Sequence, residues 1–264
     1  MKILNFLFSR SKQEQDKPIR DKLKTRKDFE RVLAEDLDIM ETTKARMDTA
    51  KNINLYMYRS LSYSYILILQ SKYSVDAKID ELRDIYIKSM HYFLQAFNKR
   101  NPIYADILNY VSLGVLLNIP DNNFRQLIDY VKQMDKQAKP SGWTPDLLLW
   151  FMLNSRMKEQ EKQKYAETLA YPRLYNGLYK VIQAPNAAAA KDALNKYLDR
   201  WYNLNSNAPW YNSHLQDNSY RGYWAWEVAA VAKIMHIDDS DLKNNQYYPY
   251  DMVHWADNET TAKE

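Results

Sequence analysis

The chain lacks cysteine altogether, which excludes disulfides, thiolate zinc sites and cysteine nucleophiles. Glycine is also scarce, with four in 264 residues. Tight strand hairpins and phosphate-binding loops use glycine for positive φ angles and close backbone approach, so the scarcity disfavours both. The sequence contains no Walker loop, dinucleotide-binding fingerprint, Gly-x-Ser-x-Gly elbow or His-Glu-x-x-His motif. We therefore expect a protein that is not an enzyme and that has no cofactor.

The sequence also lacks a large net charge and any long apolar run. The formal net charge of +4 divides into +6 for residues 1–140 and −2 for residues 141–264, an excess too scattered to predict direct nucleic-acid binding. The apolar run Leu61–Leu69 is too short to span a bilayer. The opening Met1–Phe8 resembles a signal peptide, but no small-residue cleavage site follows it. We expect a cytoplasmic protein that does not enter a membrane.

The pattern that is present is helical. Apolar residues recur at helical spacing along the chain, and no stretch alternates with period two. This predicts an all-α fold, a two-part helical bundle with essentially no β-sheet. Thr25, Asp76, Thr144 and Asn186 are expected to cap helices. The expected helices cover about residues 25–52, 54–72, 76–97, 120–137, 147–156, 158–169, 172–182, 186–202 and 219–235, and a further helix opens at Asn101-Pro102.

Lys139-Pro140-Ser141-Gly142 is the strongest break in the helical pattern, because proline and glycine interrupt regular structure. We place the domain boundary there. The expected division is an N-terminal tail (1–18), an N-terminal helical domain (19–139), a C-terminal helical domain (140–256) and a flexible tail (257–264).

Two groups near the C-terminus invite a chemical interpretation. His236 lies near Asp238 and Asp239, and His254 follows Asp251 by three residues, so either pair offers metal ligands. Short polar residues in this order also suit a cap and turn, which is the interpretation we favour, with no metal bound.

The second group is Glu227, which stands among the aromatic and small apolar residues 224–230. A carboxyl in such surroundings can act as an acid. The sequence spacing places no second carboxylate beside Glu227. We therefore favour a buried glutamate that accepts a hydrogen bond from a Tyr hydroxyl or a Trp N–H. No catalytic residue is predicted.

The stretch Tyr220-Arg221-Gly222-Tyr223-Trp224-Ala225-Trp226-Glu227 and its helical continuation to Ile234 are followed by Ile237-Asp238-Asp239 and by Tyr247-Tyr248-Pro249-Tyr250-Asp251. This order resembles the C-terminal domain of the PoNi-like immunity proteins, and Ile19–Leu23 resembles the start of that family's N-terminal domain. The resemblance covers about residues 20–255. It implies an all-α protein that neutralises a secreted DNA-degrading toxin of interbacterial competition, such as a type VI secretion effector.

Part of the motif has a structural interpretation. Gly222 permits close approach of the last helix to a neighbour, the tryptophans pack that helix, and proline fixes the tail. The structural motif comprises Gly222, Tyr223, Trp224, Trp226, Glu227, Pro249 and Tyr250.

A toxin-binding surface is expected in residues 210–251. A nuclease site that accepts phosphates presents basic groups, which local carboxylates complement even though the net basic chain disfavours whole-surface DNA mimicry. The expected carboxylates are Asp217, Asp238, Asp239, Asp241 and Asp251, and the expected aromatic anchors are Trp210, Tyr211, Tyr247 and Tyr248. The alternatives are a metal-dependent hydrolase, built on the histidines and aspartates above, and a helical scaffold without a toxin partner.

Overall fold

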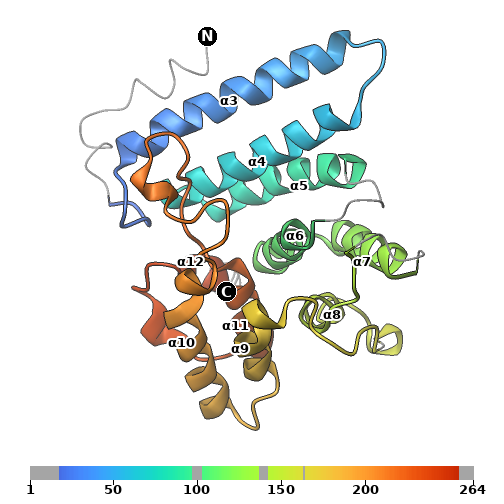
Figure 1. Cartoon of the computed structure of the whole chain (residues 1–264), viewed down its shortest axis with the longest axis vertical. Helices are drawn as coiled ribbons and strands as arrows, with labels where there is room; N and C mark the ends of the chain where they lie inside the picture. Colours follow the sequence, from blue (N-terminus) through green and yellow to red (C-terminus); the bar gives the residue numbers. More distant parts are fainter. Residues whose placement is uncertain (1–17, 97–102, 137–141, 163, 256–264) are drawn as a thin grey trace, which may run out of the picture. The chain divides into compact units, whose positions relative to one another are not determined.

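The computed structural model describes residues 18–96, 103–136, 142–162 and 164–255. These ranges contain ten α-helices, three short 3-10 helices and no strand, so the all-α prediction is confirmed. The chain forms two compact units (Figure 1). Unit 1 comprises Met1–Phe97 and Asn212–Tyr223, and unit 2 comprises Asn98–Tyr211 and Trp224–Glu264. Several predicted features lie outside the described residues: both tails apart from Pro18, the expected helix start at Asn101-Pro102, and the break at Lys139–Ser141.

Unit 1 is built on three long helices, α3 (Arg26–Thr49), α4 (Leu55–Val75) and α5 (Ile79–Ala96), with α4 packed against both others. Thr25 caps α3 as predicted, because its hydroxyl accepts from the Asp28 N–H while the Asp28 carboxylate accepts from the Thr25 N–H. The predicted role of Asp76 is wrong. Asp76 ends α4 in the left-handed conformation, with φ 93°, and α5 begins three residues later.

The segment 212–223 comes from late in the chain and completes unit 1 (Figure 1). Arg221 forms a two-pronged ion pair with Asp36 of α3, with both N–O distances 2.8 Å. The Ser74 hydroxyl donates to the Arg221 carbonyl at 2.8 Å, and the Tyr220 hydroxyl donates to the Asp21 carboxylate. These bonds attach the segment to α3, to the end of α4 and to the residues that precede α3.

The last predicted helix is therefore too long at its start. Residues 220–225 are non-helical, and α11 covers only Trp226–Met235. Gly222 has φ 111°, a conformation that a residue with a Cβ rarely adopts. Gly222 thus turns the chain before the helix, and the expected close approach of Gly222 within a helix is wrong.

Unit 2 surrounds α11, which packs against α6 (Tyr104–Leu116), α8 (Leu147–Asn154), α9 (Pro172–Ile182), α10 (Ala187–Leu204) and α12 (Tyr250–His254). Residues Val228–Ala232 of α11 are almost completely buried, because their small side chains allow neighbouring helices to pack on several sides. The remaining helix is α7 (Asp121–Lys136), which packs against α6.

Cap predictions in unit 2 are partly right. Asn186 caps α10, and α9 has the predicted bounds. The N-cap of α8 is Asp146, whose carboxylate accepts from the Leu149 N–H at 2.7 Å, so the assignment to Thr144 is wrong. The helix expected over residues 158–169 is reduced to the 3-10 turn η1 (Glu159–Glu161).

The compact units follow packing and not the break at residues 139–142. Helix α6 packs against α8 and α11 and so belongs to unit 2, although it precedes the break. Residues 212–223 follow the break but belong to unit 1, where Arg221 finds its buried partner. The boundary between residues 139 and 140 stays a prediction about the extent of two sequence domains.

Candidate functional site

The acidic residues 238–241 lie in the turn that follows α11. That helix ends at His236, which adopts the left-handed conformation with φ 51°. The chain then enters the 3-10 turn η3 (Ser240–Leu242), and an Asp238 carboxylate oxygen accepts from the Ser240 N–H at 3.2 Å. This local bond is the turn-forming role favoured from the sequence.

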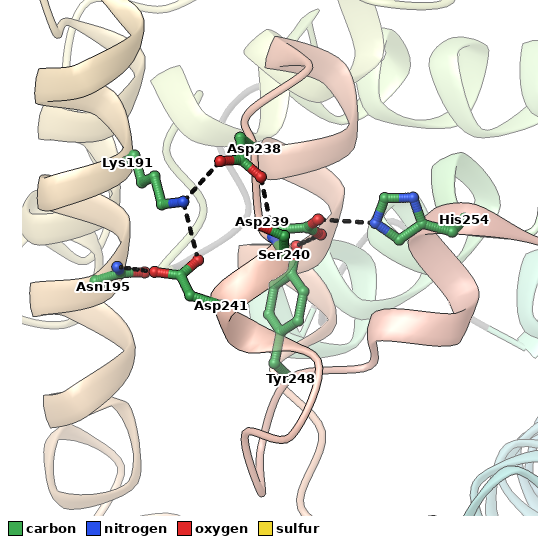
Figure 2. A network of polar contacts seen from close by, with 8 residues as sticks. All are labelled: Lys191, Asn195, Asp238, Asp239, Ser240, Asp241, Tyr248 and His254. Carbon is green, nitrogen blue, oxygen red and sulfur yellow. Dashed lines mark hydrogen bonds and ion pairs between the residues drawn. The ribbon is translucent and has the colours of Figure 1, made fainter.

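The outward side of this turn is joined to α10 by one lysine (Figure 2). The Lys191 ammonium lies 2.8 Å from an Asp238 oxygen and 3.2 Å from an Asp241 oxygen, and the Asn195 amide donates to Asp241 at 3.0 Å. The hydrogen bond from Lys191 lowers the pKa of Asp238, and the bond from Asn195 lowers that of Asp241. Two ionised carboxylates around one ammonium leave one net negative charge at the surface.

The inward side of the turn is organised by Asp239, of which 2% is exposed. Its two oxygens have separate partners, the Tyr248 hydroxyl at 2.6 Å and His254 Nε2 at 2.7 Å (Figure 2). His254 belongs to α12, so Asp239 ties the turn after α11 to the C-terminal helix. Asp239 and Tyr248 therefore support the turn from inside and present no carboxylate or ring to a partner in this conformation.

The histidines and aspartates of the hydrolase alternative lie in separate contacts. His254 and Asp239 are paired, whereas His236 caps α11. Within the part of the chain that the structure describes, no three His, Cys, Asp or Glu side chains gather closely enough to hold a metal ion.

The predicted aromatic anchors gather around the C-terminal end of α10. The Trp210 ring stacks on Trp201 with centroids 5.4 Å apart, and Tyr202 stacks on both Tyr211 and Tyr247 at 4.5 and 5.4 Å. Trp210, Tyr211 and Tyr247 each retain some solvent exposure. Because Lys191 and Asn195 also belong to α10, this helix carries contacts to both the acidic turn and the aromatic stack.

The other predicted residues are placed separately. Asp251 is exposed on α12, and Asp217 is exposed in unit 1, where its backbone carbonyl accepts from Arg31. Trp224, Trp226 and Pro249 are buried, Tyr250 is partly buried and begins α12, and the Ala225 N–H donates to the Tyr247 carbonyl at 2.8 Å. The buried Tyr223 hydroxyl accepts from the His214 N–H at 3.0 Å in unit 1.

Glu227 has the kind of partner that its sequence environment predicts. The Trp201 Nε1–H donates to its carboxylate at 2.6 Å. Loss of solvation around the carboxyl raises the pKa of Glu227 to about 7, although the residue keeps a small exposed fraction. Neutral N–H donors do not offset that desolvation.

Sequence reasoning missed Lys191, Asn195 and the Asp36–Arg221 pair. The two α10 residues are four apart and so share one helix face, a signal that was available. Asp36 and Arg221 are separated by 185 residues, and no local pattern connects them.

Two protein-family models match the chain. The model for the N-terminal part of the PoNe immunity proteins (PoNi) matches residues 11–129, and the model for their C-terminal part matches residues 144–252. The crystal structure of protein PA2201 from Pseudomonas aeruginosa has the same fold, with a TM-score of 0.70 over 97% of this chain and 95% of that one at 18% identity. No curated protein matches the sequence. The two family matches together span most of the chain, which belongs to the PoNi immunity protein family.

Proposed function

We propose that this protein binds a cognate PoNe-type nuclease toxin and neutralises it as a stoichiometric inhibitor. The match to both parts of the PoNi family carries the proposal. An inhibitor needs a complementary surface and no catalytic groups. The turn at Asp238–Asp241 suits that role, because its hydrogen bonds and ion pairs fix the shape of a surface.

The proposed contact surface is the exposed acidic turn with its neighbouring aromatic residues. The Asp238 side chain is 69% exposed and that of Asp241 47% exposed. Their excess of one negative charge over Lys191 complements the basic groups with which a nuclease binds phosphates. Trp210, Tyr211 and Tyr247 supply partly exposed rings of the type enriched in interface centres. Asp239 and Tyr248 hold this surface in shape, and Asp251 adds a carboxylate of the same unit, whereas Asp217 belongs to unit 1 and is a separate candidate.

We place the protein in the cytoplasm, where a DNA-degrading toxin meets its substrate, and place the toxin among effectors delivered between bacteria, for example by type VI secretion. Among the described helices, none combines the length and apolarity that crossing a bilayer requires.

Stoichiometry tests the inhibitory role directly. We expect DNA cleavage by the toxin to fall linearly and to stop near one molecule of this protein per toxin. Enzymatic inactivation would appear instead as progressive loss of cleavage at ratios far below one, and that outcome would contradict the proposal.

Charge reversal tests the surface. Asp238→Lys with Asp241→Lys changes the summed charge of these two positions and Lys191 from −1 to +3. Association with the toxin should therefore slow and should no longer weaken as salt is added, since complementary charges accelerate encounter. Asp129→Lys, which changes the net charge by half as much as the double variant, is the control because its carboxylate is 60% exposed on α7 in the same unit. Circular dichroism verifies the fold of each variant. Unchanged affinity and salt dependence in the double variant would remove this surface from the interface and direct attention to the more basic N-terminal half.

A further inference from the structure

Unit 2 contains a small pocket that the proposed contact surface does not use. Its volume is about 330 Å³, within the range of sites that take small groups. Ile103 and Tyr171, 42% and 43% exposed, give the pocket access to solvent. The lining residues are Ile103, Tyr104, Ala105, Tyr171, Leu174 and Tyr175.

Three tyrosines form the aromatic part of this lining. The Tyr104 ring lies 4.8 Å from Tyr171 and 5.8 Å from Tyr175, measured between centroids. Aromatic faces carry partial negative charge, and several rings around one space attract a cation. The Tyr175 hydroxyl has no hydrogen-bond partner among the described residues, although 8% of the residue is exposed. The pocket therefore has both an aromatic wall and an available hydroxyl.

Two carboxyl groups lie behind the tyrosines. The Tyr104 hydroxyl donates to Asp146 at 2.8 Å, and Asp146 is completely buried. Glu227 and Asp146 both act on Tyr175, whose pKa is raised first by burial and then by these carboxylates. Asp146 is thus one hydrogen bond away from the pocket lining, close enough to give the pocket a negative potential when it is ionised.

Neither carboxyl group is balanced by a cation. Asp146 accepts from the backbone N–H groups of Leu149 and Ala170 at 2.7 Å, and Glu227 accepts from Trp201. No lysine or arginine of the described chain forms an ion pair with either of them. A buried carboxylate without a cationic partner is costly, and a positive group that enters the pocket reduces that cost.

We propose that this pocket accepts a basic side chain of the toxin, an arginine in preference to a lysine. The guanidinium group stacks on aromatic faces and is weakly hydrated, so it loses less than an ammonium on leaving water. This inference rests on the proposed function, because the toxin supplies the occupant, but it concerns residues distinct from the acidic turn.

The chemistry of the pocket is tested with n-butylguanidinium and with its neutral isostere n-butylurea, each titrated into the full chain and followed by NMR. We expect the cation to bind about tenfold more tightly than the urea, the size of a partly desolvated cation–π interaction. Tyr171→Ala should abolish this preference, whereas Tyr56→Ala, an exposed tyrosine in unit 1, should preserve it. Equal binding of the two probes would overturn the inference in favour of a simple apolar pocket.

A second experiment measures dissociation of the toxin from the same variants. Tyr171→Ala should accelerate dissociation of the toxin about tenfold, because a hot-spot side chain contributes to the bound state. Normal inhibition by the unaltered chain with no effect of Tyr171→Ala would overturn the pocket as a toxin site and leave the proposed function standing. If the unaltered chain fails to inhibit the toxin, the proposed function fails, and with it the toxin as the occupant. Circular dichroism separates either result from a misfolded variant.

Discussion

Asp36 of unit 1 and Glu227 of unit 2 are stabilised in different ways. In unit 1, Asp36 is 2% exposed and faces the guanidinium group of Arg221 through two hydrogen bonds. In unit 2, Glu227 and the partly buried Asp135 accept hydrogen bonds from neutral donors. Asp135 accepts from the N–H groups of Trp143 and Trp150 at 2.8 and 2.7 Å, and Glu227 accepts from Trp201.

This difference determines which disturbance each unit tolerates. An ion pair keeps both charges in place, but loss of one partner leaves the other buried and uncompensated. When a carboxylate that is bound by neutral donors is lost, no charge is left behind, yet such donors oppose its protonation weakly. Burial raises the pKa of Asp36 as well, with Arg221 acting against the rise, whereas the pKa of Glu227 reaches about 7 with only neutral N–H donors to oppose the rise. Unit 1 should therefore be sensitive to mutation of the pair, and unit 2 to pH near neutrality.

The largest expected effect comes from breaking the pair in unit 1. Asp36→Ala leaves Arg221 buried, with 9% exposure and no carboxylate, and should lower the free energy of unfolding by about 3–5 kcal/mol. Asp38→Ala, an exposed aspartate on the same helix, should change it by less than about 0.5 kcal/mol. Urea unfolding of both variants measures the difference. A loss below about 1 kcal/mol for Asp36→Ala would mean that the pair is not the main attachment of residues 212–223.

The next effect is a pH dependence in unit 2. Glu227 has a folded pKa of about 7 against an ordinary value of 4.5, so the folded state binds the proton more tightly than the unfolded state. This contribution is fully present below pH 4.5 and is lost as pH rises through about 7. Each pKa unit corresponds to about 1.4 kcal/mol, which sets an upper limit of about 3 kcal/mol for the loss.

Glu227→Gln removes the titrating group and keeps an oxygen that accepts from Trp201. We expect the melting temperature of the unaltered chain to fall more between pH 5 and pH 8 than that of the variant, so that the variant is the more stable protein at pH 8. Parallel curves for the two proteins would show that Glu227 does not titrate in this range. Asp21 and Asp36, whose pKa values are also raised, remain in both proteins and cancel in the comparison.

Local physics explains what the sequence predicted well. Caps such as Thr25 and Asn186 act on backbone groups two or three residues away, and helical periodicity depends only on near neighbours, so both are readable from one sequence. The same reasoning identified the turn role of Asp238, because its acceptor bond to Ser240 is also local.

Long-range pairing explains what the sequence did not predict. Whether Asp239 faces solvent or the interior depends on Tyr248 and His254, nine and fifteen residues away. The start of α11 was misplaced because residues 220–223 have helix-compatible side chains but interact with α3 and α4. The division into compact units depends in the same way on where Arg221 finds Asp36.

The smallest expected effect on stability comes from breaking the exposed ion pairs of α10. The same change should alter the rate of toxin association, so the two properties can be measured apart. Lys191→Met removes one ammonium from two solvent-exposed carboxylates, and exposed pairs of this kind contribute little to stability. The melting temperature at pH 7 should therefore hardly change.

The pKa values of Asp238 and Asp241, which Lys191 now helps to keep low, should rise. Carboxyl-detected NMR titration measures both pKa values. The carboxylates remain ionised at neutral pH, so the local charge becomes more negative by one, and association with a basic toxin surface should become faster and more salt-dependent. Lys196→Met is the matched control, since Lys196 on the same helix pairs only with Asp192 in the described contacts. Faster association in the control variant to the same degree would mean that net charge alone, and not the turn at Asp238–Asp241, governs the encounter.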